Sequence, residues 1–145
     1  MVLVLAASSL VAQSTVAQRL GYPANAKLLI LHADDLGVAH SVNAASLDAL
    51  DQVIVAGPEI PREHWKEFYL NAIANLKPGL TEIIVHLGHD DAELQAVTVN
   101  HEPYGSAWRQ RDYDVVTSAE FKKALRDNGV ILVRYRDILK LAQQP

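Results

Sequence analysis

Two adjacent carboxylates follow an apolar run near the start of the chain. The run LLIL at residues 28–31 leads through a histidine and an alanine into Asp34 and Asp35. Two like charges side by side repel each other and lose hydration unless a cation or a proton is shared between them. A divalent metal ion supplies such a cation, with one Asp as its ligand and the other as a base acting on metal-bound water. The residues alone also allow a second interpretation, in which one Asp caps the next helix and the other is solvated.

A histidine ends a second apolar segment, EIIVHLG at residues 82–88. In parallel α/β folds, ligands and catalytic groups gather at the carboxyl ends of the strands. We therefore expect the first and the late strand to lie side by side or nearly so, with Asp34, Asp35 and His86 opening onto one edge.

The segment WRQRDYD at residues 108–114 contains groups that could clamp a substrate. Trp108 offers an aromatic face for a sugar ring, and Arg109 and Arg111 can orient a carboxylate. The alternative is a surface Arg–Asp ion pair, made by Asp112, beside a packed tryptophan. Both interpretations stay open at this level.

A His-Asp-Asp sequence also occurs at residues 89–91, and taken alone it could be a metal-binding loop. Aspartates are common where a loop enters a helix, so we expect a solvated loop with a helix start at Asp90 or Asp91. Apart from that helix start, we assign no helix or strand to the long polar stretch 89–116.

Apolar spacing predicts strands that alternate with helices, the pattern of a parallel α/β sheet. The predicted strands are 27–33, 52–56, 82–88 and 130–135. The predicted helices are a short one within 14–26 and others at 41–50, 61–76, 117–129 and 137–142. Thr117 and Glu120 match a capping box, and Gly129 is the expected stop of that helix.

Composition limits the class of protein. The chain has 145 residues, which suits one domain, and a net charge of −4 without a basic run, which argues against nucleic acid as a partner. It has no cysteine, so disulfides and thiolate metal sites are excluded. Residues 1–13 resemble the later part of a secretion signal, which favours a secreted or periplasmic protein. The alternative is an N-terminal element packed on the domain of a cytoplasmic protein. We assign residues 14–145 to one α/β domain and expect no membrane span.

Two blocks of the sequence resemble one family. HADDLGVAHSVNAASLDAL, residues 32–50, is similar to the opening motif of the YdjC-like carbohydrate deacetylases (the ChbG/HpnK group), with its strand, Asp-Asp-x-Gly turn and helix carrying Val-Asn. Residues 64–97 and 105–138 resemble the family's C-terminal third, with its Leu-Lys-Pro-Gly turn, Glu-x-x-x-His strand and Arg-x-x-Asp segment. The order of the blocks makes the resemblance specific.

The resemblance implies a TIM-barrel-like fold that removes N-acetyl groups from amino sugars or oligosaccharides with a divalent metal ion, magnesium or zinc. Carried over to this sequence, Asp35 would be the carboxylate ligand and Asp34 the general base. His86 would be a general acid or a substrate contact.

Two metal-binding histidines of the family's middle third have no counterpart here. Residues 51–65 resemble the loop before the late helix, so the middle third looks deleted. We therefore expect a partial TIM-barrel-like fold of about four mostly parallel strands with flanking helices. Catalytic zinc usually has three protein ligands, so the chain is either a fragment or recruits His32, His40 or His86 into a rearranged site.

Two functions remain open. One is a metal-dependent carbohydrate deacetylase, and the other is a non-catalytic remnant that binds carbohydrate or a partner protein. A third, weaker idea is a different α/β metal hydrolase that uses His32, Asp35 and His86. Because a partial barrel has open edges, we expect either a smaller sheet with the strand at 52–56 beside the first strand, or self-association into a homo-oligomer.

Overall fold

The computed structural model describes residues 14–33 and 50–142. In this part of the chain, four strands form a sheet in which every neighbouring pair is parallel. The strands, in their order across the sheet, are β2 (Gln52–Val55), β3 (Gly79–Val85), β1 (Lys27–Ala33) and β4 (Val130–Leu132). The predicted class, a partial barrel-like α/β fold with parallel strands, is confirmed.

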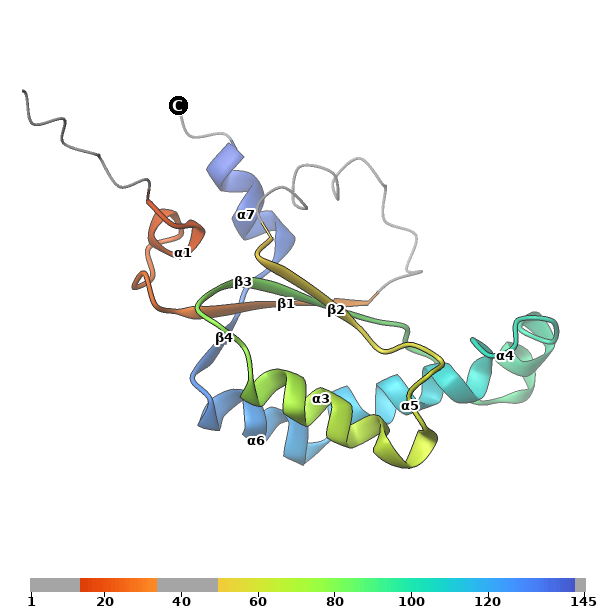
Figure 1. The fold of residues 1–145 in the computed structure, drawn as a ribbon. Coiled ribbons are helices and arrows are strands. Elements are labelled where there is room, and N and C mark those ends of the chain that lie inside the picture. The colour runs from red at the N-terminus through yellow and green to blue at the C-terminus, as the bar shows by residue number, and fades with distance from the viewer. Residues whose placement is uncertain (1–13, 34–49, 143–145) are drawn as a thin grey trace, which may run out of the picture.

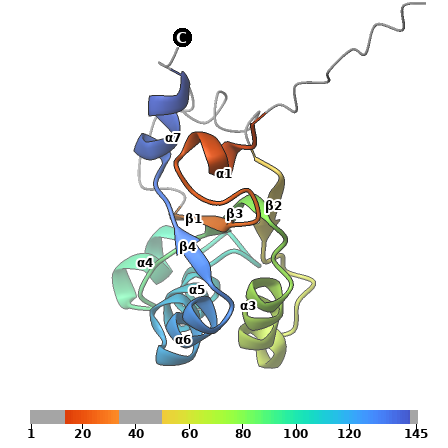
Figure 2. The same cartoon turned by 90° about the vertical axis from the view of Figure 1, so that its left-hand side faces the viewer.

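Helices cover both faces of this sheet (Figure 1). One face carries α3 (Trp65–Ala74), α5 (Ser106–Thr117) and α6 (Ala119–Asp127), and Figure 2 shows them as a layer below the strands. The other face carries α1 (Val16–Arg19) and α7 (Tyr135–Ala142). The short helices η1 (Arg62–His64) and α4 (Ala92–Val97) precede α3 and α5. No helix in the described ranges is long and apolar enough to cross a membrane.

Two cores lie on the two faces because successive strand side chains point in opposite directions. On β1, Leu29 packs into the core under α3, α5 and α6, whereas Leu28 and Ile30 pack into the core under α1 and α7. This double coverage explains why the strand reads as a continuous apolar run rather than an alternating one.

Strands β1 and β3 are direct neighbours, as predicted. Their register runs from Lys27 opposite Gly79 to Ala33 opposite Val85, so both strands end at the same edge of the sheet. We call this edge the carboxyl edge. His86 follows β3 there, whereas Asp34, Asp35 and the helix predicted at 41–50 fall in residues 34–49, outside the described ranges.

The position of β2 differs from the expectation. It pairs with β3 and lies at the outside of the sheet, not beside β1. Asp51 provides the reason: its amide donates to the Leu80 carbonyl at 2.8 Å, and its carboxylate accepts from the Leu80 amide at 2.7 Å. Gly79 leaves room for this clamp, since it has φ +122° and a Cβ there would lie 2.4 Å from an Asp51 oxygen. β3 consequently begins three residues earlier than predicted.

Two helices, α4 and α5, form in the polar region after β3, where the sequence predicted only one helix start. Helix α4 begins after Asp91, whose side chain accepts from the Leu94 amide at 3.0 Å, so the expected helix start is confirmed. Helix α5 was missed because one of its buried positions is a carboxylate, Asp112, between the buried Trp108 and Val116. A charged residue on the core side breaks the apolar periodicity by which a helix is recognised.

Helix α6 has a different cap from the one predicted. Ser118, not Thr117, accepts from the Phe121 amide, at 3.1 Å, while the Thr117 hydroxyl donates to the Tyr113 carbonyl inside α5. Gly129, with φ +63°, ends the helix as expected.

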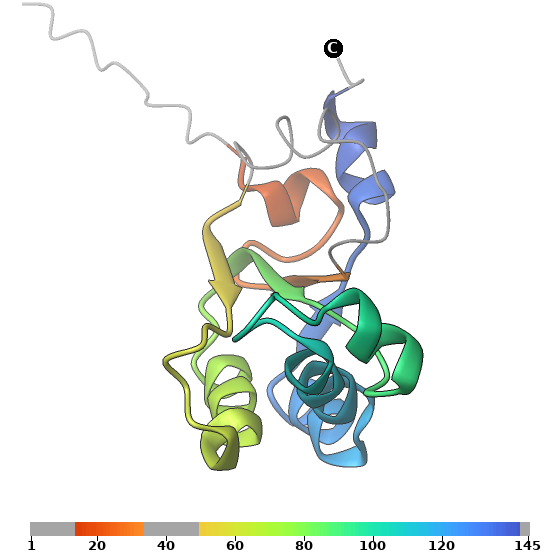
Figure 3. The same cartoon turned by 90° about the vertical axis from the view of Figure 1, so that its right-hand side faces the viewer.

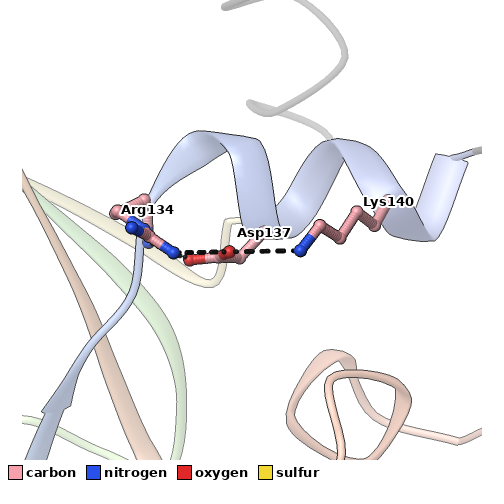
Figure 4. A network of polar contacts seen from close by, with 3 residues as sticks. All are labelled: Arg134, Asp137 and Lys140. Carbon is pink, nitrogen blue, oxygen red and sulfur yellow. Dashed lines mark hydrogen bonds and ion pairs between the residues drawn. The ribbon is translucent and has the colours of Figure 1, made fainter.

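Three charged side chains fix the start of α7 (Figure 4). Arg134 donates from Nε to Asp137 Oδ2 at 3.0 Å and from Nη2 to Oδ1 at 3.2 Å, and Lys140 Nζ lies 3.8 Å from Oδ1. The hydrogen bond from the Arg134 side chain is the main cause that lowers the pKa of Asp137. The helix therefore starts at Tyr135, earlier than predicted, and β4 is shorter than the predicted 130–135.

The outer strands leave apolar groups accessible, because Val53 and Val55 on β2 and Leu132 on β4 are about half exposed. Among the described residues, the outer edges of β2 and β4 have no neighbouring strand, and an edge of this kind can template pairing with another chain. We expect the chain to self-associate as its concentration rises, and we expect Val53→Lys to reduce this association by placing a charge on the edge strand.

Size-exclusion chromatography with light scattering measures the effect. Val97→Lys is the matched control, because Val97 is exposed on α4 and outside the sheet. A wild-type chain that stays monomeric at all concentrations would contradict the expectation, as would an equal effect of both substitutions.

Candidate functional site

A cavity of about 290 Å³ opens at the carboxyl edge of the sheet. The end of β2 and the following residues form one side, and His86 follows β3. Figure 3 views the molecule from this side, with α4 and α5 toward the viewer. The lining residues are Val55, Ala56, Gly57, His86, Tyr104, Trp108 and Arg109. Three of the residues expected at the site, from a strand end and from the segment WRQRDYD, are thus brought together.

His86 is held through both its backbone and its ring. Its amide donates to Asp112 Oδ2 at 2.8 Å, and the centre of its ring lies 4.6 Å from that of Trp108, with the planes tilted by 45°. The strand end and helix α5 therefore position the imidazole together. These two contacts hold His86 in a defined position at the cavity.

The aromatic wall of the cavity consists of Trp108 and Tyr104. Their rings meet edge to face, with centroids 5.2 Å apart and planes at 88°. Trp108 is buried and also contacts Trp65, whereas Tyr104 is exposed. Tyr104 therefore supplies much of the accessible aromatic surface, and sequence reasoning missed it. The sequence feature that could have identified Tyr104 is its position next to Gly105, where a helix begins.

Arg111 lies in a different place from Arg109. It lines a separate surface hollow of about 340 Å³ that also includes Arg62 and Lys66. Its guanidinium carbon lies 5.1 Å from the centre of the Trp65 ring, a cation–π contact. The structure therefore brings only one of the two arginines to the cavity.

Asp112 is a buried carboxylate beneath the cavity, with 1% of its surface exposed. Its Oδ1 accepts from Trp65 Nε1 at 2.9 Å and from the Tyr69 hydroxyl at 2.6 Å, and its Oδ2 accepts from the His86 amide. The interpretation of Asp112 as part of a surface ion pair is therefore wrong. Burial, and then the charge of Asp112, raises the pKa of Tyr69 far above its usual value, so this phenol remains a hydrogen-bond donor.

The other histidines differ in their surroundings. His32 lies near the end of β1, with Nδ1 2.7 Å from Oε1 of the buried Glu82. His64 is exposed on η1 and pairs with Glu67 at 3.1 Å. His89 is exposed as expected, and His101 is exposed as well. His40 lies outside the described residues.

The donor groups at the carboxyl edge bear on metal binding. Within residues 14–33 and 50–142, no three His, Asp or Glu side chains lie close enough to hold a metal ion together. Two imidazoles, His32 and His86, lie near the ends of adjacent strands, and Asp34 and Asp35 follow β1 in the sequence. Imidazole and carboxylate are donor types that suit zinc, whereas magnesium prefers oxygen ligands throughout. Within the described residues, however, these donors do not converge on one point.

We expect Asp112→Ala to destabilise the protein by about 3–5 kcal/mol. The substitution removes the acceptor of the buried Trp65 and Tyr69 donors and of the half-buried His86 amide, and each unsatisfied buried group costs about 1–3 kcal/mol. Urea unfolding measures the loss of free energy.

Asp114→Ala is the matched control for Asp112→Ala. Asp114 is exposed two residues along the same helix, where it accepts a hydrogen bond from Gln110. Its removal should change stability by at most about 0.5 kcal/mol. Equal effects of the two substitutions would show that the buried carboxylate does not organise this region.

Comparison with known proteins identifies the family. The model of the YdjC-like protein family matches residues 55–127, about half of the chain. The match includes β3, α3, α5 and α6, and therefore His86, Trp108 and Asp112. No curated protein sequence matches the chain. On the strength of the family match, the chain belongs to the YdjC-like protein family.

Proposed function

We propose that the protein binds N-acetylated amino sugars in the cavity at the carboxyl edge and that its reaction is that of the carbohydrate deacetylases. The observation that carries this proposal is the convergence of His86, Arg109 and an aromatic wall in one cavity at the ends of parallel strands. Such cavities are where α/β folds bind ligands. An aromatic ring suits the apolar face of a sugar, while Arg109 can donate to its hydroxyl or carbonyl oxygens.

The reaction proposed is hydrolysis of the acetamide. Water adds to the acetyl carbon, the carbon–nitrogen bond breaks, and the products are acetate and the free amino sugar. The nitrogen must gain a proton as it leaves, and His86 is the group at the cavity that can deliver it. Asp34 is the expected base for the attacking water. A bound divalent ion would polarise the acetyl carbonyl and lower the pKa of the water.

Asp112 supports this role of His86 indirectly. By accepting from the His86 amide, it fixes the backbone from which the imidazole projects, and through Trp65 and Tyr69 it joins that backbone to α3. A catalytic acid must be held within hydrogen-bond reach of the leaving nitrogen. The carboxylate therefore acts as a positioning group and does not touch the substrate.

A second candidate function is sugar binding without turnover. It is favoured by the observation that no three metal donors converge among the described residues, whereas catalytic zinc usually has three protein ligands. We therefore expect the isolated 145-residue chain to bind the sugar but to release little or no acetate. Acetate release from chitooligosaccharides that Asp34→Asn abolishes would show instead that the chain is an active deacetylase.

Calorimetry with N-acetylated chitooligosaccharides tests the sugar site. We expect Arg109→Ala to weaken binding at least about tenfold, since it removes a donor from the cavity, which corresponds to about 1.4 kcal/mol. Arg111→Ala is the matched control, because it removes the same charge from the same helix but outside the cavity. Equal weakening by both variants, or no binding by a folded wild-type chain, would refute the proposal.

A further inference from the structure

The wall of the cavity at the carboxyl edge contains a buried hydrogen-bond donor without an acceptor. Trp108 lines this cavity and is 3% exposed. Its Nε1 is buried and has no hydrogen-bond partner within residues 14–33 and 50–142. An indole nitrogen can only donate, and a buried donor without an acceptor costs free energy. The position of this donor at a cavity indicates that a ligand supplies the acceptor.

The other tryptophan of the chain shows how a buried indole is satisfied by the fold itself. Trp65 Nε1 donates to Asp112 Oδ1 at 2.9 Å, and the ring of Trp65 lies 6.1 Å from that of Trp108. The two indoles therefore pack against each other, but only Trp108 lines the cavity. The hydrogen bonds of the helical layer account for the indole N–H of Trp65 and leave that of Trp108 unexplained.

Three rings surround Trp108, and they differ in how firmly they are held. Trp65 is buried and bonded to Asp112, and the backbone of His86 is bonded to the same carboxylate. Tyr104 is 45% exposed and meets Trp108 edge to face just before the start of α5. Tyr104 is therefore the neighbour that can turn aside and let a ligand atom reach the indole N–H.

The charge of the lining limits which ligand group can bind there. Arg109 contributes a guanidinium, which is positive and only donates, and the described lining residues include no carboxylate. Val55 and Ala56 add apolar surface. An acetamide suits this lining, because it combines a methyl group with a neutral carbonyl acceptor. The ammonium group of a deacetylated amino sugar does not, because it carries positive charge and has no acceptor.

We propose that Trp108 Nε1 donates a hydrogen bond to the acetyl carbonyl oxygen of the sugar and thereby makes the cavity select N-acetylated over deacetylated amino sugars. A site with a buried donor rejects an analogue that leaves the donor unpaired. The inference rests on the sugar site proposed above and names the group by which that site distinguishes its substrate. The same contact favours release of the product, since the carbonyl leaves with the acetate.

Proton–nitrogen NMR of the indole groups tests this contact directly. The chain has two tryptophans, so two indole signals are expected, and Trp108→Phe assigns them. In the free chain, the Trp65 proton should lie downfield of the Trp108 proton, because only Trp65 has an acceptor. An N-acetylated chitooligosaccharide should move the Trp108 signal downfield and leave that of Trp65 in place. A fully deacetylated oligomer of the same length should move neither.

Three results of this experiment would overturn the inference. The first is a Trp108 signal that already has the shift of a hydrogen-bonded indole in the free chain. The second is binding of the N-acetylated oligomer without movement of that signal. The third is an equal movement with the deacetylated oligomer.

Calorimetry measures the selectivity that the indole provides. Trp108→Phe keeps an aromatic ring but removes the donor, and we expect the preference for the N-acetylated oligomer to fall about three- to tenfold. Tyr113→Phe is the matched control, because it removes a polar atom from an aromatic residue of α5 that contacts His89 and does not line the cavity. Circular dichroism and thermal unfolding establish that both variants are folded.

Full selectivity in a folded Trp108→Phe variant would refute the role of the indole, as would an equal loss in Tyr113→Phe. If Trp108→Phe does not fold, the titrations of the wild-type chain decide, since Trp65 and Trp108 then remain distinguishable by their different shifts in the free chain.

Acetamide as a probe separates this inference from the sugar site, because it carries the proposed acceptor without a sugar. A Trp108 signal that responds to acetamide in a chain that binds no chitooligosaccharide would overturn the proposed function alone. Sugar binding that depends on Arg109 but leaves the Trp108 signal in place would overturn the present inference alone. A folded chain that responds to neither probe would overturn both.

Discussion

The arrangement around the cavity depends on one buried carboxylate. Asp112 on α5 accepts hydrogen bonds from the side chains of Trp65 and Tyr69 on α3 and from the amide of His86 after β3. Two helices and a strand end therefore meet at a single acceptor group. Because buried donors are costly to leave unpaired, the carboxylate links the packing of the helical layer to the position of the histidine at the cavity.

On each face of the sheet, a buried carboxylate holds a histidine. Beneath the cavity, a buried Asp holds the backbone of His86, and on the opposite face the buried Glu82 holds the ring of His32. Both histidines lie where adjacent parallel strands end. A buried charge has to be met by fixed partners, so Asp112 fixes the backbone at His86 and Glu82 fixes the ring of His32.

The described part of the sheet forms a ligand-sized cavity but does not bring together a set of metal donors. At the carboxyl edge, the described residues form a cavity lined by a histidine, an arginine and aromatic rings. The same strands bring no three metal donors together. The sugar contacts proposed above would come mainly from local segments, the strand ends and the start of α5, whereas a metal centre requires donors from several strands at once. The proposed binding therefore asks for fewer converging groups than the proposed hydrolysis.

The sequence by itself determined the elements whose cause is local. The apolar runs predicted β1, β2 and the pairing of β1 with the late strand, and the aromatic spacing predicted α3, because burial imposes these patterns directly. The Asp91 helix start and the Gly129 stop likewise depend on backbone groups within a few residues. Even the separation of Arg109 from Arg111 could have been anticipated once α5 was recognised, since residues two apart in a helix face different sides.

Tertiary structure alone decided the features that join distant segments. β2 lies beside β3 because the Asp51 clamp meets the Leu80 backbone, a contact 29 residues away in the chain. Helix α5 was not predicted from the sequence because one of its buried positions is the charged Asp112, whose hydrogen-bond partners lie 26 to 47 residues away. From the sequence alone, a carboxylate is assigned to the surface, because the donors that would satisfy it in the interior are not known. The sequence could therefore identify the chemistry of this protein's polar residues, but only the folded chain determined which of them are buried and what they hold in place.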